Sequence, residues 1–336
     1  MSNALRTIVT GLLSLACLAG GAASAGEPVK IRIGYGEAPA TITPLLFLKK
    51  DLLRHQGKSY VADPIYFRGT TATLQGLGAK ELEMAYMAPA GLAHAVVNAK
   101  LDLKVVSDLA QWGTAGYHGP VYMVLEDSGI RTAADLKGKI LAVNALGTGV
   151  HLALTAMMKK VGLKEKADYT VVEVRFPAME ATLREKKVDL ISAIPPFYYQ
   201  AKAKGGVRDL FTSRDAMGPI QALFNVARAE FVQAHRAAVV DFFEDYVRVQ
   251  RWFLDPANRA EALQITAGFL KRPVGVFEGW AFTPKDYYRD PGAMPDLETL
   301  QRNIDLSVEL GALPRRIEVK EHADLSFLEE ARRRLP

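Results

Sequence analysis

The pattern of apolar and polar residues from Leu136 to Leu163 predicts a short buried strand, a polar turn and an amphipathic helix. Residues 140–143 are a short apolar run, which is typical of a buried parallel strand. Residues 144–149 interrupt the run with two glycines and polar side chains, which favours a tight loop. The apolar residues that follow recur on one face of a helix: Val150, Leu154, Met157, Met158 and Val161.

The loop before this helix is a candidate site for an anionic or strongly polar group. It would bring free backbone N–H groups, the Thr148 hydroxyl and the helix dipole to one point. The sequence Gly147-Thr148-Gly149 lacks the third glycine of a dinucleotide fingerprint and the lysine of a P-loop. On this stretch alone, a strand-to-helix turn that binds nothing is an equally good interpretation.

Strand and helix patterns alternate along most of the chain. The predicted strands are 30–35, 64–68, 82–87, 103–109, 121–125, 140–143, 170–175 and 188–194. Helical patterns lie between them, among them 45–53, 69–77 and 179–185, and the chain is mostly helical after residue 231 apart from a proline-rich loop at 271–295. This alternation predicts an α/β fold with parallel sheets.

Two halves of this region resemble each other. Ala72-Thr73-Leu74 recurs as Ala181-Thr182-Leu183, and Glu83 precedes Pro89 by the same offset as Asp189 precedes Pro195. An arginine also ends a predicted strand in each half. These matches, in the same order, predict two similar α/β units that face one another.

Ligands of open α/β sheets bind outside the carboxyl ends of the strands, and two facing units would enclose those ends in a cleft. We therefore predict ligand-binding residues mainly at strand ends. They are Glu37, Arg68, Gly69, Thr70, Thr71, Ala88, Trp112, His118, Asn144, Gly147, Thr148, Gly149, Arg175, Pro195 and Tyr198. The alternative for each arginine is a solvated strand end.

The N-terminus predicts a secretory signal peptide over residues 1–25. Arg6 precedes an apolar run, and Ala23-Ser24-Ala25 is a typical cleavage site. Cys17, the only cysteine, lies inside this signal, so the mature chain would have no disulfide, thiolate metal site or cysteine nucleophile. Ser14 stands where a lipobox has leucine, so we expect no lipid anchor.

Composition adds few constraints. The 336 residues suffice for two domains, and the formal net charge of +5 is spread along the chain, so we expect no nucleic-acid partner. The sequence has no His-Glu-x-x-His, Gly-x-Ser-x-Gly or P-loop motif, and its six histidines lack metal-ligand spacing. We therefore predict no catalytic residue, metal or cofactor.

Several motifs resemble the solute-binding proteins of ABC importers in the nitrate, sulfonate and taurine group, which includes binders of a thiamine pyrimidine precursor. They are Ala134-Asp135-Leu136-Lys137-Gly138-Lys139, Gly147-Thr148-Gly149, Val161-Gly162-Leu163, and Lys187-Val188-Asp189-Leu190 with Pro195. Gly69-Thr70-Thr71 fits the first domain more loosely, with Glu83 where an aspartate is usual. The similarity covers nearly everything after Gly26.

This resemblance implies a two-domain, type II periplasmic-binding-protein fold with a hinge and an interdomain ligand cleft. We place the chain crossings near Tyr122 and Phe224, with domain I at 26–121 plus 225–336 and domain II at 122–224. The implied function is periplasmic capture of a small molecule by a monomer and its delivery to a permease in the inner membrane.

We expect the ligand to be an organic anion, a sulfonate or carboxylate whose body can be aromatic. Arg68, Arg175 and the helix terminus at Thr148 would hold the charge, while Tyr198, Trp112 or Phe176 would contact the body.

Two alternatives stay open. An enzyme on the same fold, such as the related pyrimidine synthases, would need a cysteine-rich iron-binding motif that the mature chain lacks. A periplasmic domain that senses a ligand for a membrane kinase is compatible with the same sequence.

Overall fold

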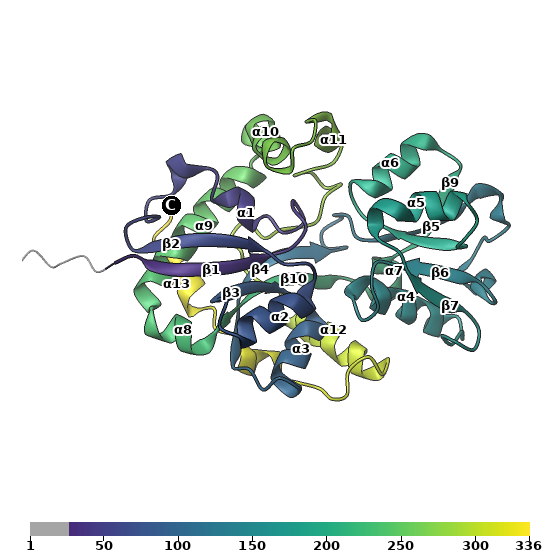
Figure 1. Cartoon of the computed structure of the whole chain (residues 1–336), viewed down its shortest axis with the longest axis horizontal. Coiled ribbons are helices and arrows are strands. Elements are labelled where there is room, and N and C mark those ends of the chain that lie inside the picture. Colours follow the sequence, from purple (N-terminus) through teal and green to yellow (C-terminus); the bar gives the residue numbers. More distant parts are fainter. Residues whose placement is uncertain (1–26) are drawn as a thin grey trace, which may run out of the picture.

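The computed structural model describes residues 27–336, which form two α/β lobes joined by two chain crossings (Figure 1). The predicted signal peptide and Cys17 lie outside the described residues. Within residues 27–336, no helix has both the length and the apolar character needed to cross a bilayer.

The first lobe is built on a mixed five-stranded sheet in the order β2-β1-β3-β10-β4. Its strands are β1 (Val29–Tyr35), β2 (Tyr60–Tyr66), β3 (Met84–Met87), β4 (Leu103–Trp112) and β10 (Ile220–Arg228). Strand β1 is parallel to β2 and β3, whereas β10 runs antiparallel to β3 and β4. The predicted parallel sheet is therefore mixed, because a strand returning from the other lobe enters it in the opposite direction.

The second lobe repeats this arrangement in the order β7-β6-β8-β5-β9. Its strands are β5 (Val121–Leu125), β6 (Ile140–Val143), β7 (Thr170–Glu173), β8 (Leu190–Ala193) and β9 (Val207–Thr212). Strand β6 is parallel to its neighbours β7 and β8, and β5 is antiparallel to β8 and β9. The two sheets share one connectivity, as the internal similarity of the sequence predicts.

The chain passes between the lobes at residues 113–120 and again at 218–219, after α7 (Ser213–Met217) of the second lobe. The second crossing comes earlier than the predicted position near Phe224. Phe224 already pairs with Met87 and Asp108 in the first sheet. No strand is predicted from the sequence at β9 or β10, so the position of the return could not be predicted.

Helices cover both sheets. Those of the first lobe are α1 (Thr43–Leu46), α2 (Thr70–Gly78), α3 (Pro89–Val97), α8 (Ala229–Ala234), α9 (Arg236–Leu254), α10 (Arg259–Leu270), α11 (Gly275–Glu278), α12 (Leu297–Glu309) and α13 (Ser326–Arg333). Those of the second lobe are α4 (Gly149–Lys160), α5 (Phe176–Arg184), α6 (Phe197–Lys204) and α7 (Ser213–Met217). The helix predicted over 45–53 is shorter, since α1 ends at Leu46 and only a 3-10 turn follows at Lys50–Leu52.

Each lobe has its own aromatic core. In the first lobe, the buried ring of Phe242 on α9 stacks on Phe47, with centroids 5.5 Å apart. In the second lobe, Tyr122 stacks on Phe211 at 4.4 Å. The aromatic stripe of α9 is therefore core, as its helical spacing predicts. Each core fixes the positions of the strand ends within its own lobe.

Candidate functional site

One group of predicted residues meets where β1 and β2 end, on the side of the first lobe that faces the second (Figure 1). The hydroxyl of Tyr66, the last residue of β2, donates to Glu37 Oε1 at 2.7 Å. Burial and this hydrogen bond raise the pKa of Tyr66 to about 12, while the positive charges of Arg68 and Arg175 act to lower it. Arg175 of the second lobe therefore lies close enough to act on a first-lobe tyrosine. We call Glu37, Tyr66, Arg68 and Arg175 the mouth group.

Both arginines of the mouth group are exposed. Within the described part of the chain, neither forms an ion pair or a side-chain hydrogen bond. By contrast, Arg32 and Arg228 of the first lobe both pair with the buried Glu83, at 2.5 Å and 3.2 Å. The mouth arginines are thus available to an external anion. Sequence reasoning missed Tyr66, although its place at a strand end next to Arg68 was a usable signal.

Three helices begin near the mouth group without a side-chain cap. Helices α2, α3 and α5 have Gly69, Ala88 and Arg175 at their N-caps, and none of these side chains accepts an N–H. Gly69 has φ of 84°, a conformation that favours glycine. Uncapped first turns, which in α2 include Thr70 and Thr71, leave N–H donors that an anion can accept.

Helices α2 and α3 start side by side. A Cβ on Gly91 would collide with the Met87 side chain and lie 3.6 Å from Thr70 Cβ. Glycine at this position therefore makes room for the Met87 side chain, and the contact with Thr70 shows that the two helix starts are neighbours. Their dipoles add at the same end of the first lobe.

The loop before α4 uses part of its own donor set internally. Thr148 Oγ1 accepts the N–H of His151 at 3.3 Å and donates to the carbonyl of Ala145 at 2.8 Å, with Asn144 Oδ1 at 3.2 Å. The amide of Gly147 donates to His151 Nδ1 at 3.0 Å. The Thr148 hydroxyl therefore acts as a helix cap, whereas the sequence-based prediction counted it among the donors for a ligand.

A second group of predicted residues lies at the first crossing. Trp112 is only 9% exposed, and its indole covers Gly149, where an added Cβ would lie 3.2 Å from Cζ3. Its Nε1 is buried without a hydrogen-bond partner in the described structure. Trp112 thus ties the end of β4 to the start of α4 across the two lobes.

His118, on the same crossing, is enclosed by aromatic rings. Its ring centroid lies 4.9 Å from that of Tyr198 and 5.7 Å from that of Tyr199, on α6. Burial lowers the pKa of His118 to about 4, so the ring is neutral at pH 7. The Tyr198 hydroxyl donates to Asp209 at 2.8 Å, within the second lobe. His118 and Tyr198 therefore pack together, close to Pro195, which is buried at the end of β8.

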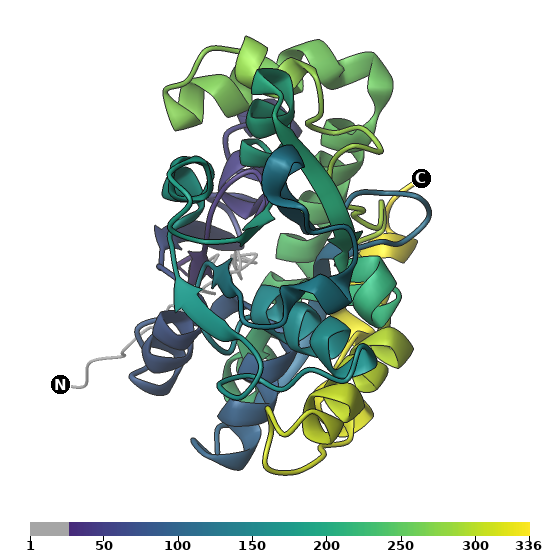
Figure 2. The same ribbon diagram turned by 90° about the vertical axis from the view of Figure 1, so that its right-hand side faces the viewer.

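Tyr199, which sequence reasoning missed, connects the lobes directly. Its hydroxyl donates to the carbonyl of Lys285 at 2.7 Å, and its ring stacks on Trp280 at 6.3 Å. Figure 1 places α6 next to α11, and in Figure 2 the end of the second lobe that carries α6 again lies against the green helices of the first lobe. A groove of about 430 Å³ lies between α6 and α11, lined on one side by Pro196, Tyr199 and Ala203 and on the other by Pro273, Val276 and Trp280.

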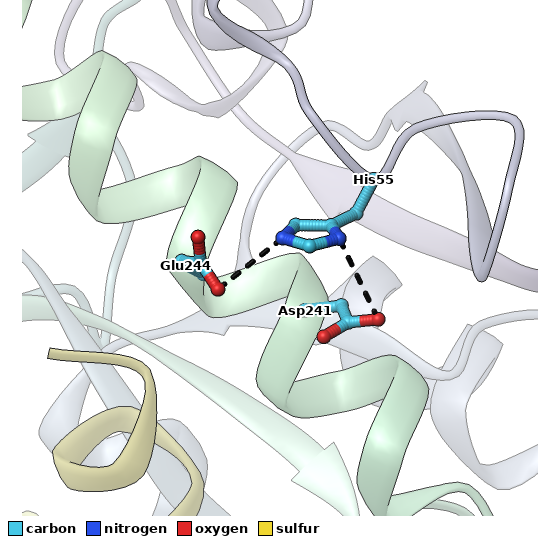
Figure 3. A group of neighbouring side chains, drawn as sticks. All are labelled: His55, Asp241 and Glu244. Carbon is cyan, nitrogen blue, oxygen red and sulfur yellow. Dashed lines mark ion pairs between the residues drawn. The ribbon is translucent and has the colours of Figure 1, made fainter. Parts of the chain in front are cut away.

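One cluster among residues 27–336 has side chains of the metal-ligating type: His55, Asp241 and Glu244, in the first lobe (Figure 3). The two ring nitrogens of His55 face different carboxylates, Nδ1 toward Asp241 at 3.7 Å and Nε2 toward Glu244 at 3.2 Å. Arg334 pairs with Asp241 at 2.9 Å, and Arg248 pairs with Glu244. This geometry fits an imidazole held between two carboxylates better than a metal site.

The fold and these sites can be compared with known proteins. A family model described as NMT1-like matches residues 24–267. The chain belongs to the NMT1-like family. An Escherichia coli (strain K12) protein, provisionally named as an aliphatic sulfonates-binding protein, is 24% identical over 333 residues, with 96% of each chain covered.

Solved structures show the same fold as this NMT1-like chain. The periplasmic aliphatic sulphonate binding protein SsuA from Escherichia coli has a TM-score of 0.67 at 20% identity, covering 88% of this chain and 92% of that one. The nitrate-binding protein NrtA from Synechocystis PCC 6803 has 0.71 at 14%, covering 92% and 89%. The desulfurization enzyme DSZB has 0.66 at 14%, covering 92% and 100%. The predicted family and the type II two-lobe fold are confirmed.

Proposed function

We propose that this NMT1-like protein is a periplasmic solute-binding protein that captures a small organic anion and delivers it to an ABC importer. The observation that carries the proposal is the mouth group. Arg68 and Arg175 come from different lobes, are unpaired within residues 27–336, and both act on the Tyr66 hydroxyl. A ligand that both guanidinium groups hold would bind more tightly when the lobes approach each other.

The chemistry of the helix starts supports an anion. Arginine forms paired hydrogen bonds with the oxygens of a carboxylate or sulfonate, and uncapped helix N-termini add further N–H donors. The two lobes have separate cores and are joined by two crossing segments. This arrangement allows the lobes to close on a ligand by a hinge motion. The similar solved structures include a sulphonate-binding and a nitrate-binding protein, which supports an anionic ligand. We favour a sulfonate or carboxylate.

The domains would comprise residues up to 112 together with those from 220 onward, and residues 121–217, with the crossings as the hinge. The chain would be exported by a signal peptide cleaved after Ala25 and would work as a monomer. Its protein partner would be a permease in the inner membrane.

The test starts with native mass spectrometry of the protein purified gently from periplasm. A thermal-shift panel of sulfonates, aromatic and aliphatic carboxylates, nitrate and pyrimidines follows. A ligand at a hundred times its Kd stabilises the folded state by about 2.7 kcal/mol, which such an assay detects. One stabilising class of anion is the expected result. Turnover of a ligand instead of simple binding would favour the enzyme alternative, because the fold of DSZB also supports an enzyme.

A further inference from the structure

We propose that His118 is a pH-sensitive latch between the lobes. Its neutral ring joins helix α6 of the second lobe to residues 283–290 of the first lobe, and protonation of the ring would drive the two apart. We call residues 283–290 the strap. The latch is a property of the lobe arrangement and does not depend on the identity of the ligand. Under the proposed function, a ligand that contacts both lobes in this arrangement would bind less tightly at acid pH.

The strap is anchored in the first lobe. Tyr288 exchanges backbone hydrogen bonds with Gln111 of β4, at 2.8 Å and 3.1 Å. Arg289 is buried and donates to the carbonyl of Pro39, in the loop after β1, at 2.7 Å. Its guanidinium also pairs with the buried Asp286 at 3.1 Å. Because separating such a pair leaves a buried charge without a partner, the strap moves with the first lobe.

His118 connects the strap to the second lobe. Its backbone N–H donates to two strap carbonyls, those of Pro284 at 3.1 Å and Asp286 at 2.9 Å. Its ring contacts α6, with its centroid 4.9 Å from that of Tyr198 and 5.7 Å from that of Tyr199. Burial raises the pKa of both tyrosines, so their hydroxyls stay neutral over the range in which a histidine titrates. A change in the charge of the His118 ring therefore acts directly on the contact between the lobes.

Tyr199 adds further contacts at the same place. Its hydroxyl donates to the strap carbonyl of Lys285 at 2.7 Å, and its ring stacks on that of Trp280 of the first lobe at 6.3 Å. These contacts and those of the His118 ring all involve α6. They can therefore break together when the lobes rotate about the crossings.

The surroundings of the His118 ring favour its neutral form. Nε2 is buried and has no hydrogen-bond partner within residues 27–336. A neutral imidazole has one N–H donor, whereas an imidazolium has two donors and a charge, which are costly to bury without partners. Burial accordingly lowers the pKa of His118 to about 4. Because the ordinary pKa of a solvated histidine is about 6.5, acid favours any arrangement in which water reaches the ring.

The carboxylates near the ring do not offset this cost. Asp286 and Asp209 both raise the pKa of His118, but by less than burial lowers it. Asp286 is already paired within the strap. Asp209, on β9, accepts the Tyr198 hydroxyl at 2.8 Å and pairs with Lys202 at 3.3 Å. Both carboxylates are thus engaged, so a protonated ring gains its solvation by movement of α6 away from the strap.

Small-angle X-ray scattering of the ligand-free protein, purified from periplasm, tests the latch from about pH 7.5 to about pH 4.5. The ratio of separated to joined lobes should rise by up to about tenfold per pH unit below about pH 6.5, so the radius of gyration should increase. His118→Phe keeps an aromatic ring and the backbone N–H but cannot take up a proton, so its radius of gyration should stay constant. His235→Gln, at the exposed histidine between α8 and α9, is the control and should respond as wild type does.

Circular dichroism at each pH distinguishes lobe movement from unfolding. A wild-type radius of gyration that stays constant down to about pH 4.5 would overturn the latch, and so would an increase that His118→Phe shares. An increase that coincides with loss of the helical signal would overturn it too, because the lobes would then be unfolding rather than separating intact. None of these outcomes touches the proposed capture of an anion, since no ligand is present in the experiment.

Discussion

Charged side chains gather at two places between the lobes, the mouth group and the chain crossings, and their surroundings differ. At the crossings, Asp286 and Arg289 are 0% and 3% exposed and form an ion pair of 3.1 Å, and Arg289 also donates to the carbonyl of Pro39 at 2.7 Å. The fully buried Asp108 accepts the Gln221 amide at 2.7 Å. At the mouth, Arg68 and Arg175 are exposed and unpaired in the described chain.

This difference separates charges that hold the structure from charges that can bind a ligand. A buried charged side chain needs a partner because the cost of removing it from water is otherwise too high. Its hydrogen-bonding groups are then already used and cannot bind a ligand. An exposed arginine keeps its hydration until a ligand replaces the water. Charge near a cleft is therefore a weak marker of a binding site, whereas unpaired charge from two lobes is a stronger one.

The largest expected effect is on stability. Arg289→Ala leaves the Asp286 carboxylate buried without its cation, so the free energy of unfolding should fall by about 3–5 kcal/mol. Arg68→Ala should change it by no more than about 0.5 kcal/mol, because the side chain is exposed and unpaired. Urea unfolding followed by circular dichroism measures both. Similar losses in the two variants would contradict the distinction between the regions.

The second effect is on ligand affinity. Arg68→Ala and Arg175→Ala should each raise the Kd for the identified anion by about 10- to 100-fold, since each removes charge-assisted hydrogen bonds. Arg315→Ala, at an exposed arginine after α12, is the matched control and should bind normally. Titration calorimetry gives the three constants. Unchanged binding in both variants would show that other residues bind the charged group of the ligand.

The third effect is on the pH dependence of stability. Burial raises the pKa of Asp108 to about 7 against hydrogen bonds that lower it, so the stability it contributes is present at acid pH and is lost as pH rises from about 4 through 7. Burial lowers the pKa of His118 to about 4, so its contribution is present above about 6.5 and is lost as pH falls to 4.

These opposite signs can be separated by substitution. Relative to wild type, Asp108→Asn should gain stability and His118→Asn should lose it as pH rises through this interval, each by at most about 1.4 kcal/mol per pH unit. Urea midpoints between pH 4 and 8 measure the two slopes. Slopes of the same sign would contradict the assignment.

The smallest effect concerns the contact between the lobes. Tyr199→Phe removes the hydrogen bond to Lys285 but keeps the stack on Trp280, so the lobe arrangement of this structure should lose about 0.5–1 kcal/mol and, if the ligand binds this arrangement, its affinity should fall about two- to fivefold. Tyr122→Phe removes a similar bond, to the carbonyl of Val150 within the second lobe, and should lower stability alone. Calorimetry and small-angle X-ray scattering with and without ligand test this. Equal affinities of the two variants would leave Tyr199 with no role in closure.

The sequence by itself determined the local elements and the family. Strand β6 covers the predicted residues 140–143, and α4 begins at the predicted loop, because periodicity and capping act within a few residues of each other. The motifs around Gly147-Thr148-Gly149 were enough to identify the family, and the repeated pattern of the two halves anticipated two sheets of one connectivity.

Only the tertiary structure decided which strands join which sheet and which charges stay free. Strand β10 returns to the first sheet from more than a hundred residues away, and no local pattern encodes that pairing. Arg32, in the middle of β1, pairs with Glu83, whereas Arg68, two residues after β2, pairs with no described residue. Tyr66 and Tyr199 are each one aromatic residue among many in the sequence. Their partners come from distant segments, so their roles depend on long-range packing that composition and spacing do not contain.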